Sequence, residues 1–171
     1  SSSTKKGVFN FAEYLVEEIE SLDEEINVNF DQKEKLQSRL RRLIGDREEI
    51  YKYFVKGVGV HRGDLPHIIR KIIEDGIRNN ALRFLVSTTT LAEGINLPLK
   101  TIIIPKPEVG GEDLSISLFF NLSGRAGRPQ IETEGQIILI ASRKFSKKFL
   151  EEKYQKAELN DIERILTPIL H

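Results

Sequence analysis

The chain has 171 residues, of which 39% are hydrophobic and 30% charged, so it is long enough for one globular domain and too short for two of ordinary size. Its 26 basic and 26 acidic side chains cancel, and any contact with a polyanion must therefore come from local placement of charge. No stretch approaches the length of a membrane span, no signal peptide is visible, and the absence of cysteine excludes disulfides and thiol chemistry. We therefore expect a cytoplasmic protein with no membrane partner. Methionine is also absent, and we expect the chain to be cut from a larger protein.

The first third of the chain predicts three helices. Asn10 to Glu13 has the form of a helix cap, and Phe11 opens an apolar stripe at helical spacing, which predicts a helix over 10–26. Asp31 repeats the cap signal for a second helix that ends at Gly45, and a third follows over 46–55. We interpret 31–56 as a helical insertion. Its basic side chains are interpreted as a solvated face, in preference to a nucleic-acid contact: Lys33, Lys35, Arg39, Arg41 and Arg42.

The middle of the chain predicts a strand, a helix and a second strand. A short apolar strand covers 57–61, and the turn after it leads to a helix that we expect Asp64 to cap. That helix should end at Asn79 and Asn80, and 83–86 then has the composition of a fully buried parallel strand. The side chains expected to face inward from the helix are Ile68, Ile69, Ile72, Ile73 and Ile77.

The second half continues the alternation of strand and helix. We expect a buried strand over 100–105, a loop over 106–113, a helix from Leu114 and a strand over 135–141. Ser142 or Ser146 should cap a last helix that runs to about Tyr154, and 157–171 reads as a tail towards a following domain. The pattern predicts a three-layer α/β fold with a mostly parallel sheet, whose first strand would lie upstream of residue 1.

The stretch Ser123 to Pro129 places two arginines three residues apart. If the apolar run before it is helical to its end, Arg125 and Arg128 leave the same face of the last turn. Two neighbouring guanidiniums favour a multiply charged anion such as a phosphate chain, which their donor geometry fits. Gly124 and Gly127 allow close backbone approach. The alternative is a solvated basic helix end.

Hydroxyl side chains follow the buried strand at 83–86. Ser87, Thr88, Thr89 and Thr90 would lie at the carboxyl end of a parallel strand, where open α/β sheets place their ligands. A threonine hydroxyl with nearby backbone amides can hold a phosphate. The same residues can also cap the next helical turn, and the two interpretations are compatible.

Three stretches occur together in one order: VGVHRGDLP at 58–66, TTTLAEGINLP at 88–98 and NLSGRAGRP at 121–129. In combination they resemble the second, C-terminal RecA-like domain of superfamily-2 helicases, in the DExH-type branch that includes the Ski-like helicases. The resemblance covers almost the whole chain, 1–171. Residues 1–4 resemble the end of helicase motif IV. The strand that carries the rest of that motif would be the missing first strand of the sheet.

The resemblance implies roles for individual residues. Arg128 matches the arginine finger that reaches the γ-phosphate of ATP held on the first RecA-like domain, and Arg125 matches its companion. Gly94 and Asn96 match the part of motif V that faces the nucleotide. Asn121 stands where many members have glutamine, and is counted with the ATP-binding residues. The implied nucleic-acid contacts are His61, Arg62 and Gly63 of motif IVa with Thr88 and Thr89 of motif V.

Two motifs of an ATP site are absent from this sequence. It has neither the GxxxxGK[ST] phosphate loop nor the DExH carboxylates that bind magnesium. The resemblance assigns both, and with them most of the binding of ATP and Mg²⁺, to the N-terminal RecA-like domain of the same protein. We therefore expect this chain to supply half of an ATP site, to grip one strand of single-stranded or duplex DNA or RNA, and to be inactive alone.

Two other functions are compatible with parts of the sequence. One is a nucleic-acid-binding or scaffolding domain of a helicase-like protein that has lost its motor activity, which the intact Arg125 and Arg128 argue against. The other is an unrelated nucleotide-binding α/β enzyme, which would need a glycine-rich loop after its first strand and an acidic ribose ligand. The three histidines lack metal-ligand spacing, so no metal site is predicted.

Overall fold

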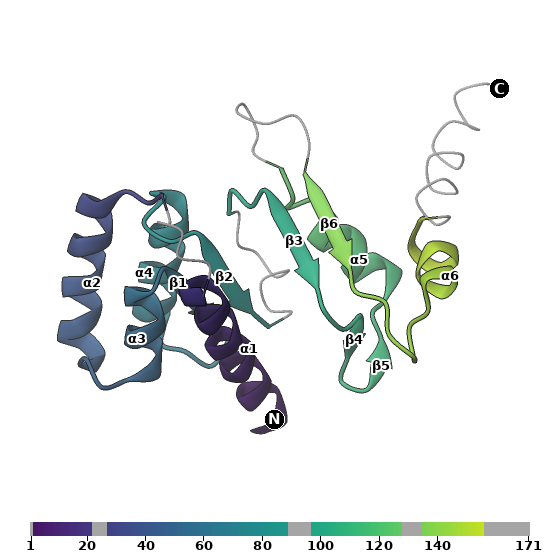
Figure 1. Ribbon diagram of the computed structural model, residues 1–171, viewed down its shortest axis with the longest axis horizontal. Helices are drawn as coiled ribbons and strands as arrows, with labels where there is room; N and C mark the ends of the chain where they lie inside the picture. Colours follow the sequence, from purple (N-terminus) through teal and green to yellow (C-terminus); the bar gives the residue numbers. More distant parts are fainter. Residues whose placement is uncertain (1, 22–26, 89–96, 128–134, 156–171) are drawn as a thin grey trace. The chain divides into compact units, whose positions relative to one another are not determined.

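The computed structural model describes residues 2–21, 27–88, 97–127 and 135–155. Contacts divide the chain into two compact units, an N-terminal unit Ser1–Leu97 and a C-terminal unit Pro98–His171. Each unit has a pair of parallel strands of its own, which Figure 1 shows with the helices around them. Within the described ranges, no helix is long and apolar enough to cross a membrane.

The N-terminal unit is built on strands β1 (Val58–His61) and β2 (Phe84–Ser87). They pair in parallel, with Val58 opposite Phe84 and His61 opposite Ser87. Side chains alternate between the two faces of a strand, and α1 covers the face of Val58 and Val60. The face of Gly59 is covered by α4, because a Cβ added there would lie 2.8 Å from Ile73 Cγ2. A helix on each face of the strand pair gives the predicted three layers within this unit.

Helix α1 (Ser2–Ser21) begins well before the predicted start at Asn10. Val8 and Ala12 are buried against β1, and Leu15, Val16 and Ile19 are partly buried beside them. Phe11, predicted to face inward, is 40% exposed. The prediction was wrong because the apolar stripe is centred on Val8 and Ala12, and a small alanine lets the helix approach the strand closely.

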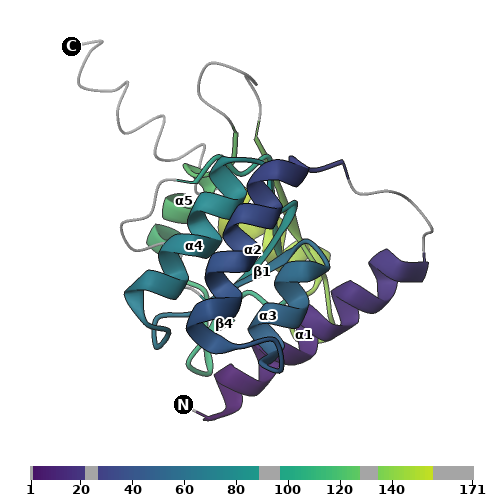
Figure 2. The ribbon, with the colours of Figure 1, turned by 90° about the vertical axis from the view of Figure 1, so that its left-hand side faces the viewer.

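Helices α2 (Phe30–Ile44) and α3 (Glu49–Val55) occupy the segment predicted as an insertion. Asn29 caps α2 by accepting a hydrogen bond from the Gln32 amide at 3.2 Å, so the predicted cap at Asp31 was wrong by two residues. Gly45 ends α2 as predicted. Figure 2 shows α2 beside α4, and α3 contacts α2 and β1. The segment is therefore packed into the unit.

Helix α4 (His67–Arg78) buries Ile69, Ile72, Ile73 and Ile77, as predicted, and ends at Asn79. Ile68 is 37% exposed, against the prediction. Asp64 does not cap this helix. The N-cap position is occupied by Pro66, and no side chain makes a capping hydrogen bond there. The Asp64 carboxylate instead pairs with Arg62, a stronger partner than a backbone amide.

The C-terminal unit pairs β3 (Thr101–Ile104) with β6 (Gln136–Leu139) in parallel register. The stretch predicted as a loop contains a hairpin of β4 (Glu108–Val109) and β5 (Glu112–Asp113). Its turn is Gly110 and Gly111, with φ of 65° and 94°, the left-handed conformation that two-residue hairpins need. In the sequence, the two adjacent glycines are the pattern that indicates such a hairpin turn.

Helix α5 (Ile116–Ser123) begins two residues after the predicted start at Leu114, is capped by Ser115 and buries Leu122. Ser146 caps α6 (Lys147–Leu150), which continues as the π-helical turn η2 (Glu151–Gln155). Strands β2 (Phe84–Ser87) and β3 were predicted to be buried, but both are partly exposed. Phe84 of β2 is 38% exposed and Ile103 of β3 is 53% exposed. The core of this unit consists of Leu114, Phe145, Leu150 and Tyr154.

Candidate nucleotide and nucleic-acid site

Helix α5 ends before the first of the two paired arginines. α5 ends at Ser123, and the Arg125 and Ala126 amides each donate to the carbonyl three residues earlier, at 3.0 Å. The prediction that Arg125 lies in the last helical turn was therefore wrong. Gly127 has a φ of 101°, which favours glycine. We call residues 124–127 the arginine turn; Arg128 lies outside the described residues.

The backbone of the arginine turn is held by two other segments of the unit. Ala126 forms a parallel bridge with Leu99, and the Gly127 amide donates to the Leu99 carbonyl at 2.7 Å. Gly135 lies against the same peptide, because an added Cβ would be 2.5 Å from the Gly127 nitrogen and nearer still to the Ala126 carbonyl. The structure thus fixes the main chain that leads to Arg128, through contacts that no local sequence pattern indicated.

Of the predicted ATP-binding residues, the structure describes two. Arg125 is half-buried in the arginine turn, and Asn121 is exposed one turn earlier on α5. A guanidinium there has the donor geometry and permanent charge that a phosphate chain requires. Gly94 and Asn96 lie outside the described residues. In the ranges that the structure covers, no group of three or more histidine or acidic residues could hold a metal ion.

Four of the predicted nucleic-acid contacts come together at the carboxyl ends of β1 and β2. His61 ends β1, Arg62 and Gly63 follow it, and the Thr88 amide donates to the His61 carbonyl at 3.3 Å. Gly63 is exposed and Thr88 half-buried. The sequence predicted this edge of the strands as a ligand site. Thr89 lies outside the described residues.

The His61 and Arg62 side chains face the interior. The His61 imidazole is fully buried, with its Nε2 3.1 Å from Glu74 Oε1. The Arg62 guanidinium lies 4.5 Å above the Phe9 ring and donates to both oxygens of Asp64, at 3.1 and 3.2 Å. Direct contact of these two side chains with a nucleic acid remains a prediction. Sequence reasoning missed Glu74, Asp64 and Phe9 as their partners.

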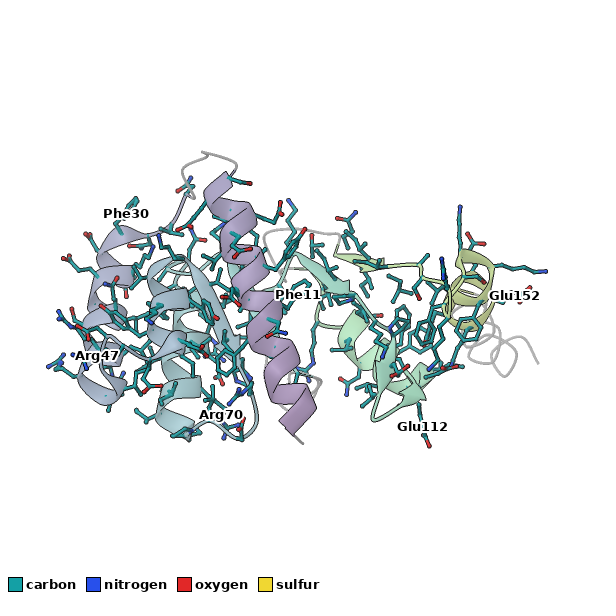
Figure 3. All side chains as sticks on the ribbon, turned by 60° about the horizontal axis from the view of Figure 1, so that its bottom comes forward. Phe11, Phe30, Arg47, Arg70, Glu112 and Glu152 are labelled. Atoms are coloured by element: carbon teal, nitrogen blue, oxygen red, sulfur yellow. The ribbon has the colours of Figure 1, made fainter. Side chains whose placement is uncertain are left out.

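Four of the five basic residues of α2 are exposed, as a solvated face requires, and Lys33 is half-buried. Lys35, Arg39 and Arg42 are exposed, and Arg41 pairs with Asp46 at 2.8 Å. Burial lowers the pKa of the Lys33 ammonium, and the charge of Lys56 lowers that pKa further. Figure 3 shows Arg47, just after this helix, pointing away from the ribbon. His67 is exposed at the start of α4, as expected of a surface residue.

Comparison with known proteins decides the family. Residues 11–130 match the helicase conserved C-terminal domain, which is most of the chain and runs through both units. The chain belongs to this family. The α/β fold is the RecA-like fold of that domain, and the chain is the second RecA-like domain of the superfamily-2, Ski-like branch.

Named relatives agree with this assignment. The chain is 31% identical to the ATP-dependent DNA helicase Hel308 of Pyrobaculum calidifontis, over 75% of this chain and 19% of that protein. It is 32% identical to the Hel308 of Caldivirga maquilingensis, over 91% of this chain and 22% of that protein. The activating signal cointegrator 1 complex subunit 3 of Dictyostelium discoideum is 39% identical over 56% of the chain and 5% of its own length. The matched part of the chain thus spans about a fifth of the length of these two Hel308 proteins.

Proposed function

We propose that the chain is the C-terminal motor domain of an ATP-dependent nucleic-acid helicase or translocase. It supplies Arg125 and Arg128 to ATP bound on the N-terminal RecA-like domain of the same protein, and it grips the phosphate backbone of one strand. In this proposal residues 1–171 form the domain, 31–56 are an insertion within it and 157–171 lead towards a following domain. The observation that carries the proposal is the arginine turn in a member of the helicase C-terminal domain family.

The arginine turn supports a role in phosphoryl transfer because its backbone is anchored. Leu99 and Gly135 hold the Ala126–Gly127 peptide, so the chain just before Arg128 has a defined place in the C-terminal unit. A charged group stabilises a transition state best when it needs no reorganisation during the reaction. ATP, held with Mg²⁺ mainly by the partner domain, supplies the γ-phosphoryl group. Arg125 and Arg128 place positive charge beside it, and Gly94, Asn96 and Asn121 line the nucleotide.

The carboxyl edge of β1 and β2 supports the nucleic-acid contact. Thr88 and Gly63 offer a hydroxyl and an exposed main chain at this edge, and both types of group commonly contact phosphate oxygens. Since contacts of this kind carry no base information, the proposal is a backbone grip that accepts DNA or RNA. The relatives named DNA helicases make DNA the first substrate to test.

The proposal is tested on the full-length parent protein by measuring ATP hydrolysis with and without single-stranded DNA or RNA. Arg128→Ala should lower the stimulated kcat by about a thousandfold or more, the loss that follows removal of an arginine finger. Arg143→Ala is the matched control, because Arg143 is an exposed arginine of the same unit. That variant should keep the rate of the wild type.

Two results would overturn the motor proposal. A normal hydrolysis rate in Arg128→Ala would remove the assigned role of this arginine. A wild-type parent that binds nucleic acid but never hydrolyses ATP would instead establish the alternative, a helicase-like domain that serves as a scaffold.

A further inference from the structure

We propose that Glu74, on α4, is a positioning residue that holds the end of β1 through His61 and thereby fixes Thr88 for contact with a nucleic-acid phosphate. The inference rests on the proposed function, because Thr88 is a binding residue only if the domain grips nucleic acid. It gives a role to a hydrogen bond between a buried histidine and a half-buried glutamate that the motor motifs leave unexplained.

The first step is the location of His61. Val58 and Val60, on the other face of β1, are fully buried apolar residues, whereas His61 places a fully buried imidazole on the face towards α4. A buried polar group costs free energy unless it is hydrogen-bonded. Glu74 follows Ile73 on α4 and is the residue that satisfies this imidazole, at 3.1 Å.

The second step is the direction of the hydrogen bond. An ionised carboxylate only accepts, so His61 must carry a proton on Nε2 and donate it to Glu74. The other ring nitrogen, Nδ1, is buried and has no hydrogen-bond partner in the described part of the chain. Among the described residues, Glu74 is therefore the one hydrogen-bond partner that holds this buried ring.

The third step connects His61 to Thr88. The His61 carbonyl accepts the Thr88 amide, and Ser87, opposite His61 in the register, donates its hydroxyl to the Thr88 carbonyl at 2.8 Å. Both ends of the Thr88 main chain are thus tied to the edge of the strands that His61 closes. Removal of the Glu74 acceptor leaves a buried N–H without a partner, and the end of β1 must shift or admit water to satisfy it.

The test measures the affinity of the full-length parent for a single-stranded oligonucleotide at one fixed salt concentration. Glu74→Leu removes the acceptor and should weaken binding by about tenfold. Glu74→Gln keeps an oxygen that accepts the hydrogen bond and should restore affinity to within about twofold. Asp75→Asn is the matched control, because Asp75 and Glu74 both pair with Arg78 but only Glu74 contacts His61. It should bind as the wild type does.

A double-mutant cycle with Thr88→Val separates positioning from general destabilisation. If Glu74 acts through Thr88, the variant with both Glu74→Leu and Thr88→Val should bind no more weakly than the weaker single variant. Losses that multiply would show that Glu74 acts elsewhere and would overturn the inference.

Three further outcomes are decisive. If Glu74→Leu fails to fold, Glu74→Asp replaces it, since a shorter carboxylate keeps the charge and loses reach; wild-type affinity in folded Glu74→Asp would overturn the inference. A wild-type parent that binds no nucleic acid overturns this inference and the proposed function together. Normal binding by the wild type and by Glu74→Leu overturns only the role of Glu74.

Discussion

Gly124 is the first residue of the arginine turn and Gly135 lies against it, and an added methyl group would meet very different surroundings at the two positions. At Gly135 it would collide with the backbone of Ala126 and Gly127, which cannot move aside without breaking the bond to Leu99. At Gly124, which has ordinary helical dihedrals, its nearest neighbour would be the Phe120 carbonyl oxygen at 3.5 Å. This contact is normal packing, so the two glycines serve different purposes.

This contrast predicts the effects of two substitutions in the parent protein. Gly135→Ala should destabilise folding by about 1–3 kcal/mol, as forced overpacking does, and should lower stimulated ATP hydrolysis by displacing the arginine turn. Gly124→Ala should leave both unchanged. Urea denaturation and ATPase rates measure the two effects. Wild-type behaviour of Gly135→Ala would show that the turn is not held there.

Tyr154 offers a second test at the scale of one residue. Its buried hydroxyl donates to the Leu114 carbonyl at 2.7 Å, and burial raises the pKa of this phenol, with a smaller contribution from Asp113. Tyr154→Phe leaves that carbonyl without its donor and should cost about 1–2 kcal/mol in urea denaturation. Tyr14→Phe, at an exposed position, should cost less than about 0.5 kcal/mol. Equal costs would contradict the proposed anchoring by the hydroxyl.

Among the elements, α1 and β1 each carry a glycine whose surroundings decide the effect of alanine. Gly7 of α1 has no atom within 4 Å of an added Cβ, whereas at Gly59 of β1 Ile73 and Leu82 lie within 3.0 Å of it. Gly7→Ala should stabilise the helix by about 0.5–1 kcal/mol. Gly59→Ala should destabilise the N-terminal unit by about 1–3 kcal/mol. Thermal denaturation of the two variants should therefore shift in opposite directions.

The ion pairs of Glu108, on the β4–β5 hairpin, should make the stability of the protein depend on pH. Hydrogen bonds from Lys106 and Lys144 hold the pKa of the Glu108 carboxyl below its usual range. A depressed pKa means that the ion pairs stabilise the fold above about pH 4.3, the usual value for glutamate, and that this stability is lost as the pH falls through the lower folded value. Glu108→Gln should therefore lose less stability between pH 6 and pH 3 than the wild type does.

A matched substitution lies on the same hairpin. Figure 3 shows Glu112 pointing away from the ribbon, and Glu112→Gln should keep the full acid sensitivity of the wild type. Added salt should weaken the Glu108 contribution, since both lysines are largely exposed. Identical acid sensitivity in Glu108→Gln and wild type would contradict the assignment.

The elements also show how far the sequence could predict this fold. The parallel strands were visible as short apolar runs, so β1, β3 and β6 lie within their predicted ranges. Helix starts were harder, because Asn29 and Asp31 are both good caps and only the chain path chooses between them. The contact of His61 with Glu74 depends on the rotation of α4 against β1, and the need for Gly135 comes from a peptide in another segment. Such requirements arise only after the chain has folded.

For the whole molecule, the match to the helicase domain runs through both compact units, so neither unit alone contains the complete set of motifs. The motif IVa and V residues that are described belong to the N-terminal unit, and the arginine turn belongs to the C-terminal unit. The sequence predicted one domain over 1–171 and did not indicate a division into two units. The positions of Gly94, Asn96 and Arg128 could not be predicted from the sequence, and these three residues lie outside the described residues.

A prediction at this scale concerns the isolated chain 1–171. Because it carries no phosphate loop and no DExH carboxylates, it should hydrolyse no ATP above background, with or without nucleic acid. The full-length parent, assayed in parallel, should show stimulated hydrolysis. Turnover by purified 1–171 that Arg128→Ala abolishes would mean that the chain contains a complete site, and would refute the division between two domains.

The contacts that close the C-terminal unit also set an order of events during synthesis. Glu108 pairs with Lys144, 36 residues later, and Asp113 and Leu114 bind Lys153 and Tyr154, each 40 residues later. The described strands and helices of the N-terminal unit are all made before the first of these late partners leaves the ribosome. If the chain folds as it is made, we expect the strand pair that carries His61 to form first, while the hairpin and Leu114 lack their partners until residues 40 positions later have been translated. A nascent chain that stalls before Tyr154 would leave the Leu114 carbonyl without its donor.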